Sequence, residues 1–167
     1  MESDPAPEGQ TKEKPMKFLI TLLIDWPARI ARPFTWLAPL VARLTVGYVF
    51  LLSGWGKLNN LPKVIENFVG WGIPHADLLA PFVSAVEFGG GLLLLLGLCT
   101  RIAAAPLVIV MIVAIRTALW EQVDSLETLL GFEEFSYLVI FLWLAISGPG
   151  AISVDRILQN WNRSLED

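Results

Sequence analysis

The chain has 167 residues, of which 54% are apolar and 17% are charged, and its mean hydropathy is +0.59. Charged residues are too few to cover a soluble domain of this length, for which about 25% is typical, so lipid is the expected surrounding. The lone Cys99 excludes an intramolecular disulfide and a thiolate metal cluster, and the lone His75 excludes bis-histidine haem ligation. A net charge of −4 without a basic stripe argues against a nucleic-acid partner.

The N-terminal region divides into two predicted segments. Residues 1–15 combine charge with proline and glycine and contain no large apolar residue, which predicts a disordered tail. Residues 16–35 begin with an apolar run that is too short for a bilayer, which needs ~20 residues. We therefore expect a short interfacial helix there, with a cleaved signal peptide as the alternative. Its arginines and tryptophans would lie among the lipid headgroups: Arg29, Arg32, Trp26 and Trp36.

Four longer apolar stretches follow, each long enough to cross most or all of a ~30 Å hydrocarbon core. They cover approximately residues 36–56, 78–98, 102–120 and 134–148. They are apolar on all sides, whereas membrane strands alternate apolar and polar residues. The sequence therefore predicts an all-α fold, a four-transmembrane-helix bundle with a short N-terminal interfacial helix. The membrane domain would cover 36–156, followed by a cytoplasmic tail over 157–167.

The basic residues predict the orientation of the bundle. With the N-terminus in the cytoplasm, eight lysines and arginines lie inside and only Lys57 and Lys63 lie outside. This positive-inside bias places both termini in the cytoplasm. The connections over residues 57–77 and 121–133 are then outer loops, where function carried by loops would lie.

Charged residues within the spans are the candidates for a buried polar site. Arg43 and Lys57 share one face of the first span, and Arg43 lies ~9 Å inside its boundary. Glu87, near the middle of the second span, has a similar depth, so we expect an Arg43–Glu87 ion pair. Two alternatives are that Arg43 extends to the headgroups and that the pair only fixes helix register.

A second set of charges lies toward the outer side. Arg116 in the third span and Glu134 at the start of the fourth have opposite charge at similar depth, which predicts another ion pair. The alternative is an interfacial salt-bridge cluster that holds the loops. The candidate buried polar site therefore comprises five residues: Arg43, Glu87, Lys57, Arg116 and Glu134. No catalytic residue, metal site or intrinsic cofactor is predicted.

Three consecutive glycines, Gly89, Gly90 and Gly91, follow Glu87. Glycine weakens a helix, and in membranes it usually admits the backbone of a neighbouring helix. Space for a flat ligand beside Glu87 is the alternative. Glycine packing is the favoured interpretation.

Four motifs in order resemble the DoxX family. They are R-L-x-V-G-x-x-F-L-x-S-G-x-x-K-L from Arg43, F-x-x-x-G-I-P from Phe68, E-F-G-G-G-L-L-L-L-L-G-L-x-T-R from Glu87 and G-P-G-A-I-S-V-D from Gly148. The resemblance covers about residues 36–156 and implies a small four-helix membrane protein of bacteria or archaea. The family's polar signature then falls on six positions: Arg43, Lys57, Glu87, Arg101, Glu134 and Asp155.

The resemblance implies a function in membrane redox assemblies, because the family's namesakes are subunits of quinone-linked oxidoreductase complexes. We expect an accessory subunit in the bacterial cytoplasmic (inner) membrane, which docks a soluble or membrane oxidoreductase and shelters a quinone. A homo-oligomer is a further candidate assembly. The alternatives are a small transporter or hydrophobic-ligand-binding membrane protein, and a membrane enzyme that uses Glu87 as acid or base.

Overall fold

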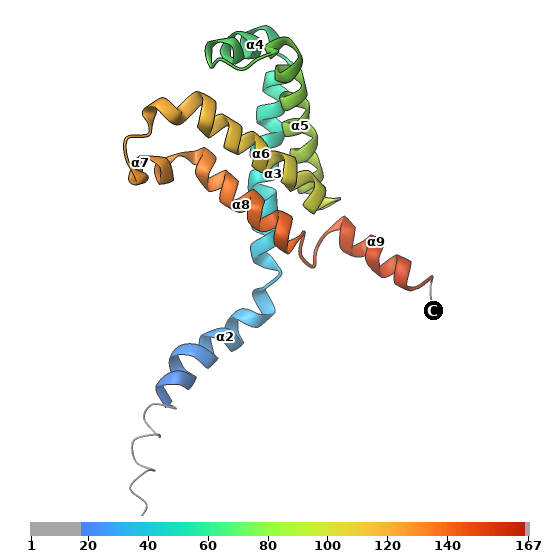
Figure 1. Ribbon diagram of the computed structural model, residues 1–167. Helices are drawn as coiled ribbons and strands as arrows, with labels where there is room; N and C mark the ends of the chain where they lie inside the picture. Colours follow the sequence, from blue (N-terminus) through green and yellow to red (C-terminus); the bar gives the residue numbers. More distant parts are fainter. Residues whose placement is uncertain (1–17, 166–167) are drawn as a thin grey trace, which may run out of the picture. The chain divides into compact units, whose positions relative to one another are not determined.

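The computed structural model describes residues 18–165, and every element that it assigns in this range is a helix (Figure 1). The all-α prediction is therefore confirmed for the described part of the chain. The predicted tail over residues 1–15 lies outside the described residues. The chain divides into two compact units, residues 1–37 and 38–167.

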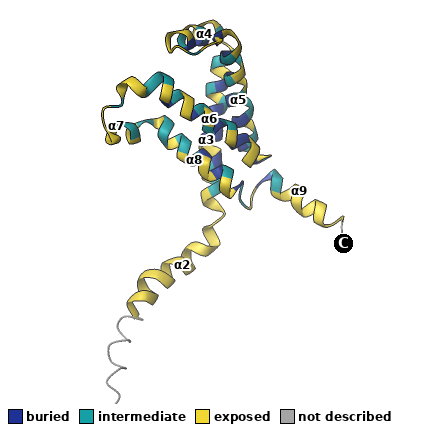
Figure 2. Cartoon of the chain, viewed as in Figure 1, coloured by how far each residue is buried: buried dark blue, intermediate teal, exposed yellow. Residues whose placement is uncertain are grey.

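The described part of the first unit is helical from residue 18 to 34, where the sequence predicts an interfacial helix. It comprises a π-helical turn, a short α-helix and a 3₁₀ turn: η1 (Thr21–Asp25), α2 (Trp26–Ala31) and η2 (Arg32–Phe34). All of its described residues are exposed (Figure 2). Large apolar side chains such as Phe18, Leu23 and Trp26 thus have no cover within the unit. Its place at a membrane interface stays a prediction.

The second unit contains three helices that are long and apolar enough to cross a membrane. They are α3 (Leu37–Leu58), α5 (Ala76–Leu96) and the continuous run Thr100–Gln122, which joins α6 (Thr100–Ala114), η3 (Ile115–Leu119) and η4 (Trp120–Gln122). The fourth predicted span corresponds to α8 (Glu133–Ser147), which has 15 residues. At 1.5 Å per residue α8 is ~22 Å long, less than the ~30 Å hydrocarbon core.

An apolar core joins these helices. α6 packs beside α5 and α8, and buried side chains from all four helices form one cluster, including Val46, Phe50, Leu94, Leu107 and Phe141. The Phe50 and Phe141 rings meet edge to face with centroids 4.7 Å apart. Only about a third of each spanning segment is buried in the protein, 28–33%, and the rest is an apolar outer surface. A bilayer is the solvent that suits such a surface.

Glycines bring α3 and α5 together. A Cβ on Gly54 would lie 2.6 Å from Phe88 Cα, and a Cβ on Gly91 would lie 2.8 Å from the Gly47 carbonyl oxygen. Neither distance is compatible with a real side-chain carbon, so only glycine permits this approach. Gly90 faces Leu107, whereas Gly89 has open space around it. The predicted packing role is confirmed for Gly91 and does not extend to Gly89.

Both predicted outer loops contain helices. The connection over 57–77 carries α4 (Leu61–Gly70), whose Val64 and Phe68 pack on Ala76 and Ala80 of α5. The connection over 121–133 carries the short α7 (Leu126–Gly131). We call the end of the bundle with α4 the α4 end, and the opposite end, with the α5–α6 turn, the turn end. The last helix, α9 (Val154–Arg163), begins at the turn end, within the sequence G-P-G-A-I-S-V-D that starts at Gly148.

Candidate functional site

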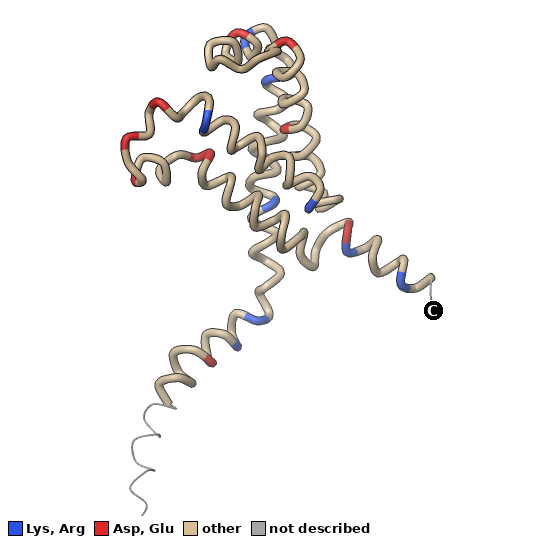
Figure 3. Tube along the Cα trace, viewed as in Figure 1, with Lys and Arg blue, Asp and Glu red and all other residues tan. Residues whose placement is uncertain are grey.

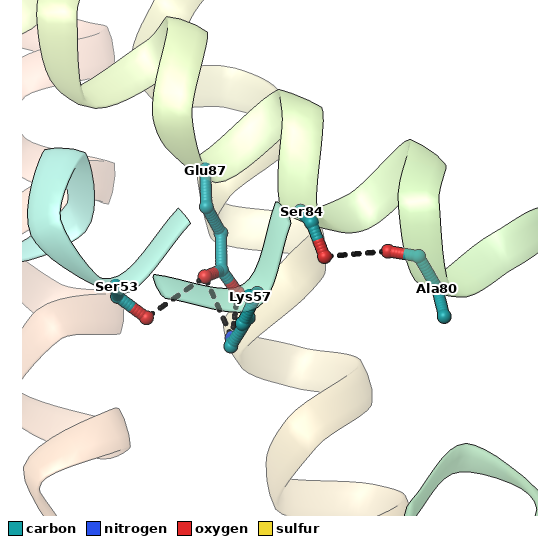
Figure 4. Close-up of polar contacts among 5 residues, drawn as sticks. All are labelled: Ser53, Lys57, Ala80, Ser84 and Glu87. Carbon is teal, nitrogen blue, oxygen red and sulfur yellow. Dashed lines mark hydrogen bonds and ion pairs between the residues drawn. The ribbon is translucent and has the colours of Figure 1, made fainter. Parts of the chain in front are cut away.

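A buried carboxylate lies between α3 and α5. The Lys57 ammonium nitrogen lies 2.6 Å from both Oε1 and Oε2 of Glu87, and the Ser53 hydroxyl donates to Oε2 at 3.0 Å (Figure 4). Ser53 and Lys57 are four residues apart, so they lie one above the other on the same helix face. Glu87 is 2% exposed and the Lys57 side chain 36% exposed. The pair therefore holds a charged carboxylate inside the protein and leaves part of the lysine accessible.

The predicted Arg43–Glu87 ion pair is wrong. Arg43 is buried, but its Nη2 donates to the carbonyl oxygen of Ile152, at the turn end of the bundle. The glycine contacts explain the error, because they set Phe88 beside Gly54 and Gly91 beside Gly47. In that register Glu87 is level with Ser53 and Lys57.

Glu87 does not lie at the depth of Arg43, as the sequence predicted, because α5 extends past the end of α3. Its first residues, including Ala76 and Ala80, pack against α4 instead of lying beside α3. Glu87 therefore lies nearer the α4 end than a count from equal boundaries indicates. One feature of the sequence indicated the correct partner of Glu87, since Lys57 shares the helix face of Arg43 and is the next basic residue along it.

Arg43 belongs to a separate cluster at the turn end. Its guanidinium lies against Gly97, which has a φ of 66°. The Asp155 carboxylate accepts hydrogen bonds from the backbone N–H groups of Cys99 (2.7 Å) and Thr100 (3.1 Å). In return, the Asp155 N–H donates to the Gly97 carbonyl at 3.0 Å. This cluster ties the start of α9 to the α5–α6 turn.

A largely apolar cavity of about 700 Å³ lies in the half of the bundle toward the α4 end. Side chains from α3, α4, α5, α6 and α8 line it, with Phe50, Phe68 and Val86 among the apolar members. Lys57, Glu87 and Ser53 give it one polar wall, and Glu134 and Tyr137 also line it. An apolar hollow with a few convergent polar groups is the usual form of a small-molecule site.

The remaining two predicted site residues, Arg116 and Glu134, do not lie together in the structure. Glu134 lines the large cavity, but Arg116 lies over the Trp120 ring, 5.2 Å from its centroid. Among the described residues no ion pair joins Arg116 to Glu134, so that predicted pair is also wrong. Arg116 instead lines a smaller open hollow of about 480 Å³ with Trp71 and Glu121.

The fold and the site together define a class of protein. Long apolar helices with lipid-suited surfaces, an internal ion pair and an apolar cavity are features of a helical integral membrane protein. Comparison with known proteins gives the family: residues 38–120 match the DoxX family model. The chain belongs to the DoxX family.

Relatives in three bacteria support this assignment. The inner membrane protein YqjF of Escherichia coli (strain K12) is 34% identical over 122 residues, which cover 71% of this chain and 90% of YqjF. The uncharacterized membrane protein Rv3486 of Mycobacterium tuberculosis (strain ATCC 25618 / H37Rv) is 38% identical over 130 residues, 70% of this chain and 78% of the relative. The "Putative oxidoreductase CatD" of Bacillus subtilis (strain 168) is 30% identical over 118 residues, which cover 70% of this chain and 83% of CatD. No solved structure matches this chain.

Proposed function

We propose that this chain is an accessory subunit of a quinone-linked redox complex in the inner membrane, and that its cavity binds the quinone head. The single observation that carries the proposal is the position of the Lys57–Glu87 pair in the wall of a largely apolar cavity. In this proposal the chain has four spans with both termini in the cytoplasm. The α4 end then faces outward and the turn end faces the cytoplasm.

The packing of α8 supports a fourth span. α8 lies beside α6 and buries Phe141 and Leu144 in the core. Its opposite side exposes Leu142 and Ile146, which suit contact with lipid. A helix shorter than the hydrocarbon core is accommodated by local thinning of the bilayer at modest cost.

The residues around the cavity fit a quinone head. Lys57 has three N–H donors, and in the described part of the chain its ammonium contacts two acceptors, the Glu87 oxygens at 2.6 Å, which leaves a donor for a ligand carbonyl. Apolar side chains such as Val83, Val86 and Val110 would cover the flat faces of a ring. When bound, a quinone would supply electron-transfer chemistry. This chain's residues would hold the ring, orient a carbonyl toward Lys57 and exclude water.

The accessory role is supported by the site and by one relative. The site joins a lysine, a glutamate and a serine, none of which carries electrons, so a redox partner would have to deliver them. CatD is named as an oxidoreductase of unconfirmed status, which is consistent with a redox setting for this family. A hydrophobic-ligand carrier or small transporter would use the same cavity without a redox partner.

Ligand content and partner capture test the proposal. The chain would be solubilised gently, and its bound lipids and co-purifying proteins identified by mass spectrometry. We expect a quinone at a stoichiometric level and an oxidoreductase. Ala114→Phe, which places a ring in the cavity wall, should remove the quinone, whereas Ala105→Phe on the exposed side of α6 should retain it. Equal quinone content in both variants would contradict the cavity site, and quinone without any oxidoreductase would favour the carrier.

A further inference from the structure

The C-terminal helix α9 has one apolar face that the described part of the protein leaves uncovered. Ile157, Leu158 and Trp161 recur at intervals of one and three residues, which places them in a single stripe along the helix, and Leu165 follows two residues after its end. All four are exposed, with Ile157 at 67% and Trp161 at 63%. The opposite face is polar. α9 extends away from the bundle after its first turn (Figure 1).

The start of α9 is fixed at the level where two spans end. Asp155 accepts hydrogen bonds from Cys99 and Thr100, in the turn between α5 and α6. Ser153 caps the helix, since its hydroxyl accepts from the Arg156 N–H at 3.2 Å. Because α5 and the continuous run Thr100–Gln122 are of spanning length, the turn that joins them lies at a membrane boundary. α9 therefore emerges at the depth of the lipid headgroups.

The charges of α9 match an anionic lipid surface. Its basic residues, Arg156 and Arg163, lie near the two ends of the helix (Figure 3), and the helical period places both opposite the apolar stripe. Its acidic residue within the helix, Asp155, is already engaged by the α5–α6 turn. An apolar stripe with tryptophan, opposite a basic polar face, is the pattern of helices that lie in the membrane interface.

We propose that α9 is an interfacial helix that lies on the leaflet at the turn end, with Ile157, Leu158 and Trp161 inserted at the boundary between headgroups and acyl chains. Arg156 and Arg163 then face anionic headgroups. This proposal needs only that the chain crosses a membrane, and it holds whether or not the cavity binds a quinone.

Site-specific labelling of the full chain in lipid nanodiscs tests the proposal. Cys99→Ser removes the native thiol and keeps the backbone N–H that Asp155 binds. A fluorophore sensitive to polarity would then be attached at Ile157→Cys or, as the matched control, at Gln159→Cys on the opposite face. Both positions are exposed, so neither label disturbs packing. The discs contain phosphatidylcholine and phosphatidylglycerol, with or without a spin-labelled lipid that quenches by contact.

We expect the label at position 157 to emit at shorter wavelength and to lose most of its intensity to the spin-labelled lipid, while the label at 159 stays water-like. Arg156→Gln with Arg163→Gln should reduce the quenching at 157 to its value in discs without phosphatidylglycerol. Water-like emission at both positions would overturn the proposal. A shifted but unquenched label at 157 would also overturn it, because protein, such as a second copy, would then cover the face.

Discussion

Lys57 and Glu87 form an ion pair in which the ammonium nitrogen lies 2.6 Å from both carboxylate oxygens, and the two partners differ in their access to solvent. Glu87 is almost fully buried, whereas the lysine side chain is partly exposed. A buried ion pair is rarely the most stabilising choice, because apolar side chains of similar volume often serve as well or better. Stability alone therefore does not account for the pair.

The first prediction concerns the unequal cost of removing each partner. Lys57→Met removes the cation and leaves the buried Glu87 carboxylate with the Ser53 hydrogen bond. Removing one partner of a buried ion pair costs roughly 3–5 kcal/mol, and we expect a loss near the lower end of that range. Glu87→Leu should cost less, because the remaining ammonium can reach water. Adding Glu87→Leu to Lys57→Met should recover part of the loss. The free energy of unfolding would be measured by titration of detergent-solubilised protein with sodium dodecyl sulfate.

Arg43 supplies the control for that cycle. It contacts Ile152 and shares no hydrogen-bond partner with Glu87 among the described residues. The effects of Arg43→Met and Glu87→Leu should therefore add to within about 0.3–0.5 kcal/mol. Strong coupling between Arg43 and Glu87, with additivity between Lys57 and Glu87, would contradict the pairing described above.

The second prediction separates the glycines after Glu87. Gly91→Ala places a Cβ against the backbone of α3 and should destabilise by at least the ~1–3 kcal/mol typical of overpacking. Gly89→Ala meets open space and should be neutral or stabilise by up to about 0.5–1 kcal/mol, since alanine favours the helix. The same unfolding titration measures both variants. Equal gains in stability for the two variants would show that helix propensity, not the contact with α3, decides the effect.

The sequence predicted helices better than it predicted which side chains meet. The apolar runs predicted α3, α5 and the run Thr100–Gln122 to within a few residues, because length and composition alone are enough to recognise a spanning helix. The register between α3 and α5 depends on glycine contacts such as Gly54 with Phe88. These contacts join residues that are far apart in the sequence, so the pattern within one helix does not reveal them. The helix α4 was missed because its polar residues resemble those of a loop. Its Val64 and Phe68 are spaced four apart, and that period was the available signal.

The third prediction concerns orientation. If the turn end faces the cytoplasm, a thiol reagent that cannot cross membranes should leave the exposed Cys99 unmodified in intact cells and modify it after permeabilisation. In a Cys99→Ser background, Asn60→Cys, just before α4, should react without permeabilisation. Modification of Cys99 in intact cells would reverse the proposed topology.

The fourth prediction concerns pH near α7. The Thr128 hydroxyl donates to Asp124 and lowers the pKa of that carboxyl below its ordinary value. The hydrogen bond thus stabilises the folded state at pH values above the pKa that Asp124 has in the unfolded chain. This contribution is lost as the pH falls through the lower pKa that Asp124 has in the folded state. Thr128→Val should raise the pKa toward the ordinary value. Nuclear magnetic resonance titration of the Asp124 carboxyl carbon measures it, and an unchanged pKa would assign the shift to other contacts.

The last prediction asks whether the Lys57–Glu87 pair holds a ligand or only clamps two helices. A Lys57→Met, Glu87→Leu double variant replaces the pair with apolar side chains, which can preserve stability. If Lys57 donates to a quinone carbonyl, the folded double variant should lose its quinone, because no apolar side chain replaces a hydrogen-bond donor in an apolar cavity. Quinone content and partner co-purification would be compared with wild type at equal folded yield. If both are unchanged, the pair is a structural clamp and the cavity does not use Lys57 as a donor.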